Sequence, residues 1–205
     1  MPIRFVLFLM LVPLAGCARF TASQELLIED AIALSNATVA DSLFGSIVLH
    51  MGEADEIAWG RQRVRRMPAR ARTQPTRWLL NEIQTNGVLD LGDLRPWKKH
   101  APIAALTSPC EPNTQLNLLQ LDRDVFALAG TLVHERTHAL CVTHPRSQKR
   151  LDNICDPAYV FGDLTETLAR HRDADARLRV LRPLCPALCQ RLYDADVVFA
   201  CTPPE

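Results

Sequence analysis

The segment between Asp122 and Pro145 constrains the fold most strongly, because its sequence favours one long helix. Asp122 and Asp124 suit the start of a helix, where a carboxylate can accept hydrogen bonds from free backbone N–H groups. Pro145 sets the other limit, since the residue before a proline is pushed out of the helical region. We therefore predict a helix that reaches about Val142. Its apolar side chains are Phe126, Leu128, Leu132, Val133, Ala139 and Leu140.

Hydrophobic periodicity predicts more helices and little sheet. Thr21 and Gln24 form a potential capping box for a helix running through Leu34, and apolar residues continue to Val48. Residues 92–114 contain four prolines and are expected to be largely irregular. The sequence therefore predicts a mainly α fold, that is, α+β with a small sheet. The remaining predicted elements are helices at 77–84, 163–181 and 186–199 and a short strand at 116–121.

The N-terminus has the pattern of an export signal. Arg4 precedes a short apolar run that is too short to span a bilayer and suits a signal-peptide core. The run ends in Leu14-Ala15-Gly16-Cys17, which resembles the lipobox of bacterial lipoproteins. That resemblance implies a signal peptide at 1–16, lipidation of Cys17 and a membrane anchor through its acyl chains. Ala18 after the cysteine implies an outer-membrane protein, and we expect it to face the periplasm.

Length and charge narrow the remaining possibilities. The chain has 205 residues, which suits one domain at 17–205 after the signal. Its 23 basic and 23 acidic side chains balance, so no overall positive field indicates a nucleic-acid partner.

Six cysteines follow Cys17, and an even number in an exported chain indicates disulfide bonds. The sequence contains no CxxC pair, which disfavours a cysteine metal site. Six cysteines allow 15 pairings, and the spacing does not choose among them. A bond between Cys141 and Cys155 is a guess, made because Cys141 follows the long helix closely and the bond would lock that helix to the loop containing Cys155. The six are Cys110, Cys141, Cys155, Cys185, Cys189 and Cys201.

Two histidines in the long predicted helix have the spacing of a metal site. His134 and His138 are four residues apart, so they point to the same side, about 40° apart in projection and roughly 6 Å along the axis. Two imidazoles placed in this way can reach one metal ion. Glu135 lies beside the pair and is placed to hold a metal-bound water rather than the metal.

The run His134-Glu135-Arg136-Thr137-His138 resembles the zinc-binding helix of the zincin metallopeptidases, which share the HExxH motif. The resemblance covers at most some 50 residues around the motif. It implies a zincin-like domain in which the two histidines bind Zn²⁺ and Glu135 is the catalytic base. It also implies that a strand before the helix, here 116–121, binds the substrate backbone. Arg136 departs from the family pattern, which has an uncharged residue there.

Two residues compete for the role of third zinc ligand. His144 has the metzincin spacing, HExxHxxGxxH, but Cys141 occupies the glycine position, where the chain must turn back in a conformation that favours glycine. The metzincin Met-turn is also missing. Glu166 matches the gluzincin arrangement, in which a glutamate on the next helix completes the site. We favour Glu166 at this stage, although the gluzincin acid four residues later is Arg170 here.

The sequence therefore predicts a zinc-dependent hydrolase, and more specifically a metallopeptidase acting on peptides or proteins of the cell envelope. Glu135 would accept a proton from metal-activated water. Tyr159 or His171 are candidates for stabilising the oxyanion. The alternative is a non-catalytic envelope lipoprotein that keeps a zincin-like fold as a binding or assembly module. Arg136 and the absence of the gluzincin acid favour that alternative.

Overall fold

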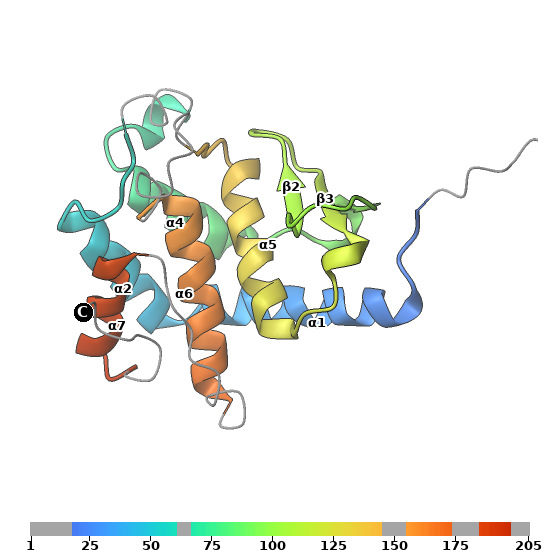
Figure 1. Cartoon of the computed structure of the whole chain (residues 1–205). Coiled ribbons are helices and arrows are strands. Elements are labelled where there is room, and N and C mark those ends of the chain that lie inside the picture. Colours follow the sequence, from blue (N-terminus) through green and yellow to red (C-terminus); the bar gives the residue numbers. More distant parts are fainter. Residues whose placement is uncertain (1–17, 61–66, 145–154, 174–184, 198–205) are drawn as a thin grey trace, which may run out of the picture.

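The computed structural model describes residues 18–60, 67–144, 155–173 and 185–197. This part of the chain is mainly helical with one small mixed sheet, which confirms the predicted fold class (Figure 1). The predicted signal peptide at 1–16 and the lipidation site Cys17 lie outside the described residues. The helices are α1 (Ala22–Val39), α2 (Ser42–Glu53), α4 (Pro75–Asn86), α5 (Val125–Ala139), α6 (Pro157–Arg172) and α7 (Pro186–Asp194), and the strands are β1 (Leu94–Trp97), β2 (Ala105–Thr107) and β3 (Thr114–Asn117).

Local sequence signals define several helix ends correctly. Thr21 and Gln24 form the predicted capping box of α1, in which each side chain accepts a hydrogen bond from the other residue's backbone N–H. The Asp124 side chain caps α5 by accepting from the N–H of Ala127. Gly87 ends α4 with a φ of 71°, a conformation that glycine adopts without a steric penalty.

The sheet differs from the sequence prediction. The predicted strand at 116–121 is shorter and earlier, because Asn117 caps a turn of 3-10 helix at Leu118–Gln120. The prediction of irregular structure at 92–114 is wrong in part, since β1 and β2 lie within that range. The strand order is β1-β3-β2, with β1 parallel and β2 antiparallel to β3. β3 therefore lies in the centre, and β2 is an edge strand.

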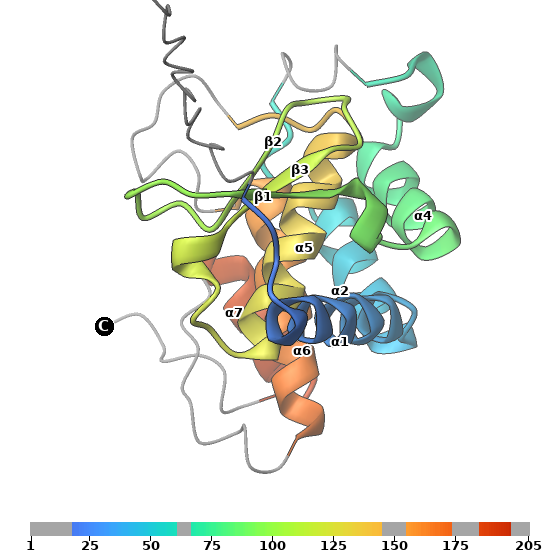
Figure 2. The ribbon, with the colours of Figure 1, turned by 90° about the vertical axis from the view of Figure 1, so that its right-hand side faces the viewer.

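Helix α5 occupies the centre of the arrangement. It packs along α6 on one side, and α1 crosses both helices (Figures 1 and 2). The sheet packs against another side of α5 through β2. One apolar cluster joins α2, α4, α6 and α7 and includes an edge-to-face contact between Phe44 and Phe161. A second cluster fills the space between α1, α5 and the sheet, around Leu116 and Leu132. Burial of these side chains provides the main driving force for folding.

Helices α5 and α6 approach each other closely where Gly130 faces Gly162. A Cβ atom added to Gly130 would lie 2.8 Å from the carbonyl oxygen of Gly162. A Cβ atom added to Gly162 would lie 2.9 Å from the carbonyl oxygen of Gly130. Only residues without a side chain allow this separation, so the two glycines set the distance between the helices.

Disulfide bonds are confirmed, but the guessed pairing is wrong. Cys141 is bonded to Cys110, and Cys155 is bonded to Cys185. Cys110 lies between β2 and β3, so the first bond ties the end of α5 to the sheet. Cys189 is also in a disulfide, and Cys201 lies outside the described residues. The pairing depends on which segments meet in space: the end of α5 is locked to the sheet through Cys110 rather than to the loop containing Cys155.

Disulfides are typical of exported proteins, so their presence agrees with the predicted export. Within the described residues, no single helix has both the length and the apolar character needed to cross a membrane. Helices α1 and α2 taken together meet both requirements by length and composition alone, but the chain bends by 63° between them.

The glycine crossing predicts the effect of added methyl groups. Gly130→Ala and Gly162→Ala should each lower the free energy of unfolding by about 1–3 kcal/mol, because the methyl group forces two helix backbones apart. Gly45→Ala in α2 is the matched control, since its Cβ would meet no atom closer than 3.4 Å. That change should leave stability equal or raise it by about 0.5–1 kcal/mol through helix propensity. Urea unfolding measures all three, and equal stability of the crossing variants and the control would contradict the assignment.

Candidate metal site

Three histidines converge at the C-terminal end of α5. Nε2 of His138 lies 3.2 Å from Nε2 of His134 and 3.1 Å from Nε2 of His144. The ligand atoms of the three residues all lie within 4.8 Å of one another. Within the part of the chain that the structure describes, no other group of three metal-ligating side chains is this compact. The three histidines therefore form a candidate metal site.

His144 reaches the cluster because the chain reverses after α5. Cys141 adopts the left-handed conformation with a φ of 71°. Its N–H donates to the carbonyl of His138, and the N–H of Val142 donates to the carbonyl of Thr137. These two bonds form a Schellman turn, which closes a helix and redirects the chain. Val142 is fully buried beyond the turn, and His144 folds back beside His138.

Each imidazole has a polar neighbour: His138 and His134 have hydrogen-bond partners, and His144 has a carboxylate at ion-pair distance. Nδ1 of His138 lies 2.7 Å from the carbonyl oxygen of Val142, so this nitrogen must donate and Nε2 keeps its lone pair. The ring of His134 bonds the backbone of Ala158 at the start of α6. Nδ1 of His144 lies 3.3 Å from Oδ2 of Asp156. Such partners direct the remaining nitrogens and raise their basicity toward a metal.

Burial keeps the two helix histidines neutral. The pKa of His134 is well below its usual value because of burial and, to a lesser degree, the neighbouring charges of His138 and His144. Burial also lowers the pKa of His138, although the hydrogen bond to Val142 opposes this effect. Neutral imidazole is the form that binds a metal. The three imidazoles, with ligand atoms this close together, could therefore hold a metal ion.

Glu135 lies next to the histidines and is held by the edge strand. Its side chain is 5% exposed, and burial raises the pKa of the carboxyl. The hydroxyl and the backbone N–H of Thr107, the last residue of β2, hydrogen-bond the carboxylate and lower that pKa in part. Oε2 of Glu135 is buried and has no hydrogen-bond partner among the described residues. A buried free acceptor is costly, which fits a group meant to bind a ligand's proton.

The two oxyanion candidates occupy different positions. Tyr159 stacks on the ring of His144 with 5.1 Å between ring centroids and contacts the ring of His134 at 4.7 Å. Burial raises the pKa of its hydroxyl, as do the charges of Asp156, Asp163 and Glu135, so it is a proton donor. His171 lies about 18 Å further along α6 and does not line the pocket beside the site. Of these two candidates, Tyr159 alone lies beside the clustered histidines.

Glu166, the third ligand favoured from sequence, is not in the histidine cluster. Its Oε1 accepts hydrogen bonds from Arg170 at 2.8 and 3.2 Å. Arg170 is 3% exposed and also contacts both carboxylate oxygens of Asp124 at 2.7 Å. Hydrogen bonds to these two acids raise the pKa of Arg170, although burial opposes them. The carboxylate of Glu166 is thus engaged in an ion-pair network that links α6 to the start of α5.

Arg136, which departs from the family motif, acts away from the histidines. On a helix it is rotated about 200° from His134. Burial lowers the pKa of its guanidinium, and the charges that oppose this effect are those of Asp93 and Glu82. Its charge is therefore directed toward α4 and the turn before β1, so it does not interrupt the site.

A pocket of about 320 Å³ opens beside His134 and Glu135. Its other walls come from α5, from α6 and from the segment Pro102–Ala105, which leads into β2. β3, which includes the start of the predicted substrate strand at 116–121, does not line this pocket. β3 is paired on both sides and cannot accept another strand, whereas β2 is an edge strand and adjoins the pocket.

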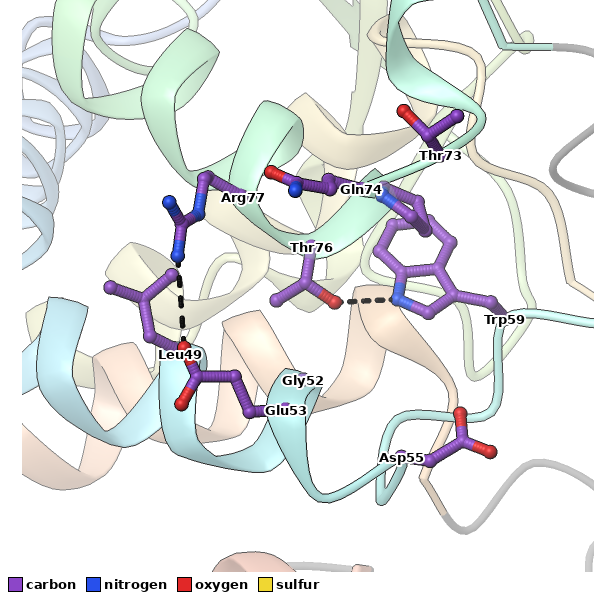
Figure 3. Close-up of a pocket in the computed structure, with 10 residues that line it drawn as sticks. Leu49, Gly52, Glu53, Asp55, Trp59, Thr73, Gln74, Thr76 and Arg77 are labelled. Atoms are coloured by element: carbon purple, nitrogen blue, oxygen red, sulfur yellow. Dashed lines mark hydrogen bonds and ion pairs between the residues drawn. The ribbon is translucent and has the colours of Figure 1, made fainter.

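A second pocket, of about 410 Å³, lies between α2 and α4 (Figure 3). Nε1 of Trp59 donates to the hydroxyl of Thr76 at 2.7 Å within its wall. Arg77 and Glu53 face each other across it at 3.6 Å, and both are well exposed. These polar groups satisfy one another, and the three clustered histidines do not line this pocket.

Asp156 should tune metal binding through His144. Its other oxygen, Oδ1, caps α6 by accepting from Ala158, and asparagine keeps such a cap. We expect Asp156→Asn to weaken zinc binding about 10–100-fold, because the negative charge beside His144 is lost. Asp41→Asn is the matched control, since Asp41 caps α2 in the same way. Zinc titration against a competing chelator measures both, and equal affinities would show that Asp156 only caps the helix.

Comparisons of the chain with protein-family models, with curated proteins and with solved structures give no match.

Proposed function

We propose that this chain is a zinc-dependent hydrolase, and specifically a metallopeptidase similar to the metzincin branch of the zincins. The observation that carries the proposal is the close approach of three imidazoles, one of them buried, next to Glu135, whose Oε2 is buried and has no hydrogen-bond partner among the described residues. His134, His138 and His144 would hold the metal. The HExxH spacing places Glu135 beside it, and the spacing to His144 is that of the metzincin ligands.

The chemistry of the donor set favours zinc. Three neutral imidazoles with an open fourth position are the ligand pattern of catalytic zinc sites, whereas calcium and magnesium prefer oxygen ligands. Zinc bound there would polarise a carbonyl group and make a water molecule more acidic. The side chain of His144 is 34% exposed and His134 lines the pocket, so two of the three rings can be reached from outside the core.

The protein's own groups supply proton transfer and positioning. Glu135 accepts a proton at Oε2 while Thr107 holds the rest of its carboxylate. The raised pKa of Glu135 brings its basicity closer to neutral pH, which suits a group that first accepts and then returns a proton. The ring of Tyr159 contacts those of His134 and His144, and its hydroxyl donates a hydrogen bond to the negative charge that develops on the substrate carbonyl.

The edge strand supports a peptide substrate. An extended peptide can pair with the free edge of β2, because main-chain hydrogen bonds need no particular sequence. This edge leads from the pocket beside His134 to Thr107, which holds Glu135. A peptide bound there lies next to the catalytic carboxylate. With the lipoprotein signal, we propose that the substrates are peptides or proteins of the cell envelope, reached from an anchor at Cys17.

The identity of the third ligand is tested by substitution. His144→Ala should weaken zinc binding by more than about 100-fold, because a direct ligand contributes more than a residue that only orients one. Glu166→Gln should leave zinc affinity unchanged, since the amide still accepts hydrogen bonds from Arg170. His100→Ala, at an exposed histidine, is the control. Loss of zinc with Glu166→Gln and its retention with His144→Ala would return the assignment to Glu166.

Glu135→Gln separates metal binding from catalysis. The amide keeps the shape of the side chain but cannot accept the proton from water, so hydrolysis should fall by about 10²-fold or more. Zinc content should stay at the wild-type level, because Glu135 is not a ligand. The measurement is cleavage of an unfolded protein substrate together with metal analysis of the purified variant.

Two results would contradict the hydrolase. An equally active Glu135→Gln variant would remove this residue from the mechanism. Wild-type protein that binds no zinc would favour the alternative of a non-catalytic binding or assembly module.

A further inference from the structure

The disulfide between Cys110 and Cys141 lies at the turn that brings His144 to the metal site. Both cysteines adopt the left-handed conformation, with φ values of 70° and 71°. Their Cα atoms are 4.3 Å apart. Cys110 belongs to the connection between β2 and β3, and Cys141 lies midway between His138 and His144. The bond therefore joins the sheet to the segment that carries the third histidine.

The left-handed conformation is unfavourable for a residue with a Cβ atom. Without other constraints, each such residue prefers a right-handed or extended conformation by a factor of about five to thirty. Hydrogen bonds offset part of this preference, since the N–H groups of Cys110 and Cys141 both donate to the carbonyl of His138, at 3.0 and 2.8 Å. The covalent link adds a constraint that water cannot replace. It holds two strained residues against the same carbonyl of the metal-binding helix.

The two described disulfides differ in exposure. Cys110 is exposed and Cys141 is half-buried, so a reducing molecule can approach this bond. Cys185, in the bond to Cys155, is 1% exposed and packs in the large apolar cluster. Attack on a disulfide requires access to one of its sulfur atoms. A reductant therefore reaches the bond beside the metal site more readily than the bond in the core.

We propose that the Cys110–Cys141 disulfide is a positioning element of the metal site, and that its reduction by a dithiol weakens metal binding by freeing His144. This inference rests on the metal site of the proposed function. One thiolate of the dithiol attacks a sulfur of the bond and forms a mixed disulfide, and its second thiol then displaces the protein. Cys110 and Cys141 gain two electrons and two protons and become thiols, and the dithiol is oxidised to its own disulfide.

Glycine at position 141 separates conformation from covalent linkage. The double variant Cys110→Ser with Cys141→Ser lacks the bond and keeps a Cβ atom in the strained turn. The double variant Cys110→Ser with Cys141→Gly also lacks the bond but accepts the left-handed conformation. We expect the first to bind zinc at least about tenfold more weakly than wild type, in keeping with the conformational preference of the turn. The second should recover most of the loss.

The matched control removes the other described bond. Cys155→Ser with Cys185→Ser should lower thermal stability but leave zinc affinity of the folded protein within a small factor of wild type, because neither residue holds the turn. Circular dichroism confirms that each variant is folded before zinc is titrated against a chromogenic chelator. The same control variant is then treated with dithiothreitol, and the freed thiols are alkylated. Its zinc affinity should fall as it does in Cys110→Ser with Cys141→Ser.

The outcomes distinguish this inference from the hydrolase proposal. Equal zinc affinity in the oxidised, reduced and double serine proteins overturns the positioning role while leaving the metal site intact. Stronger binding after reduction also overturns it, because the freed thiols would then act as ligands. A disulfide-dependent zinc affinity in a protein that hydrolyses no peptide supports the positioning role and removes the hydrolase. Wild-type oxidised protein that binds no zinc overturns both.

Discussion

The contact between Gly130 and Gly162 determines how closely α5 and α6 approach, and the rest of the site depends on that distance. α5 carries the metal-binding pair, whereas α6 brings Tyr159 and the backbone of Ala158 to the ring of His134. Asp156, the residue before α6, places a carboxylate oxygen beside Nδ1 of His144. A larger residue at either crossing position would move all these partners together, because they belong to one rigid helix. Close packing here is therefore a functional constraint as well as a structural one.

The end of α5 shows how an unfavourable local conformation can be maintained by tertiary contacts. A cysteine in a left-handed turn is disfavoured by itself, yet the Schellman hydrogen bonds, the burial of Val142 and the bond to Cys110 all stabilise it. The result is a short reversal that returns His144 to the helix it has just left. A glycine would satisfy the backbone alone, whereas cysteine also attaches the turn to the sheet.

Electrostatics and burial act together in this site. Removing His134 and His138 from water favours their neutral forms and leaves lone pairs that face one another. Removing Glu135 from water raises its pKa and leaves Oε2 with no partner within the described residues. Such an arrangement lowers stability when it binds nothing, since buried polar atoms without partners are costly. A cation held by the nitrogens, with water beside the carboxylate, would satisfy all of these groups.

The sequence by itself determined what depends on neighbouring residues: the capping box at Thr21, the start of α5 at Asp124, and the common direction of His134 and His138. Helical spacing fixes these features through bonds between residues three or four positions apart. The end of α5 was not determined in this way, because the helix predicted to reach about Val142 ends at Ala139. The two strands within 92–114 were missed because their pairing is non-local and each is only three or four residues long. The third histidine was ranked below Glu166 because the penalty at Cys141 was visible from sequence, while its compensation came from Cys110, 31 residues earlier. Only the tertiary structure brings that cysteine to the turn, and only its combined constraints make a left-handed cysteine, and hence the three-histidine cluster, stable.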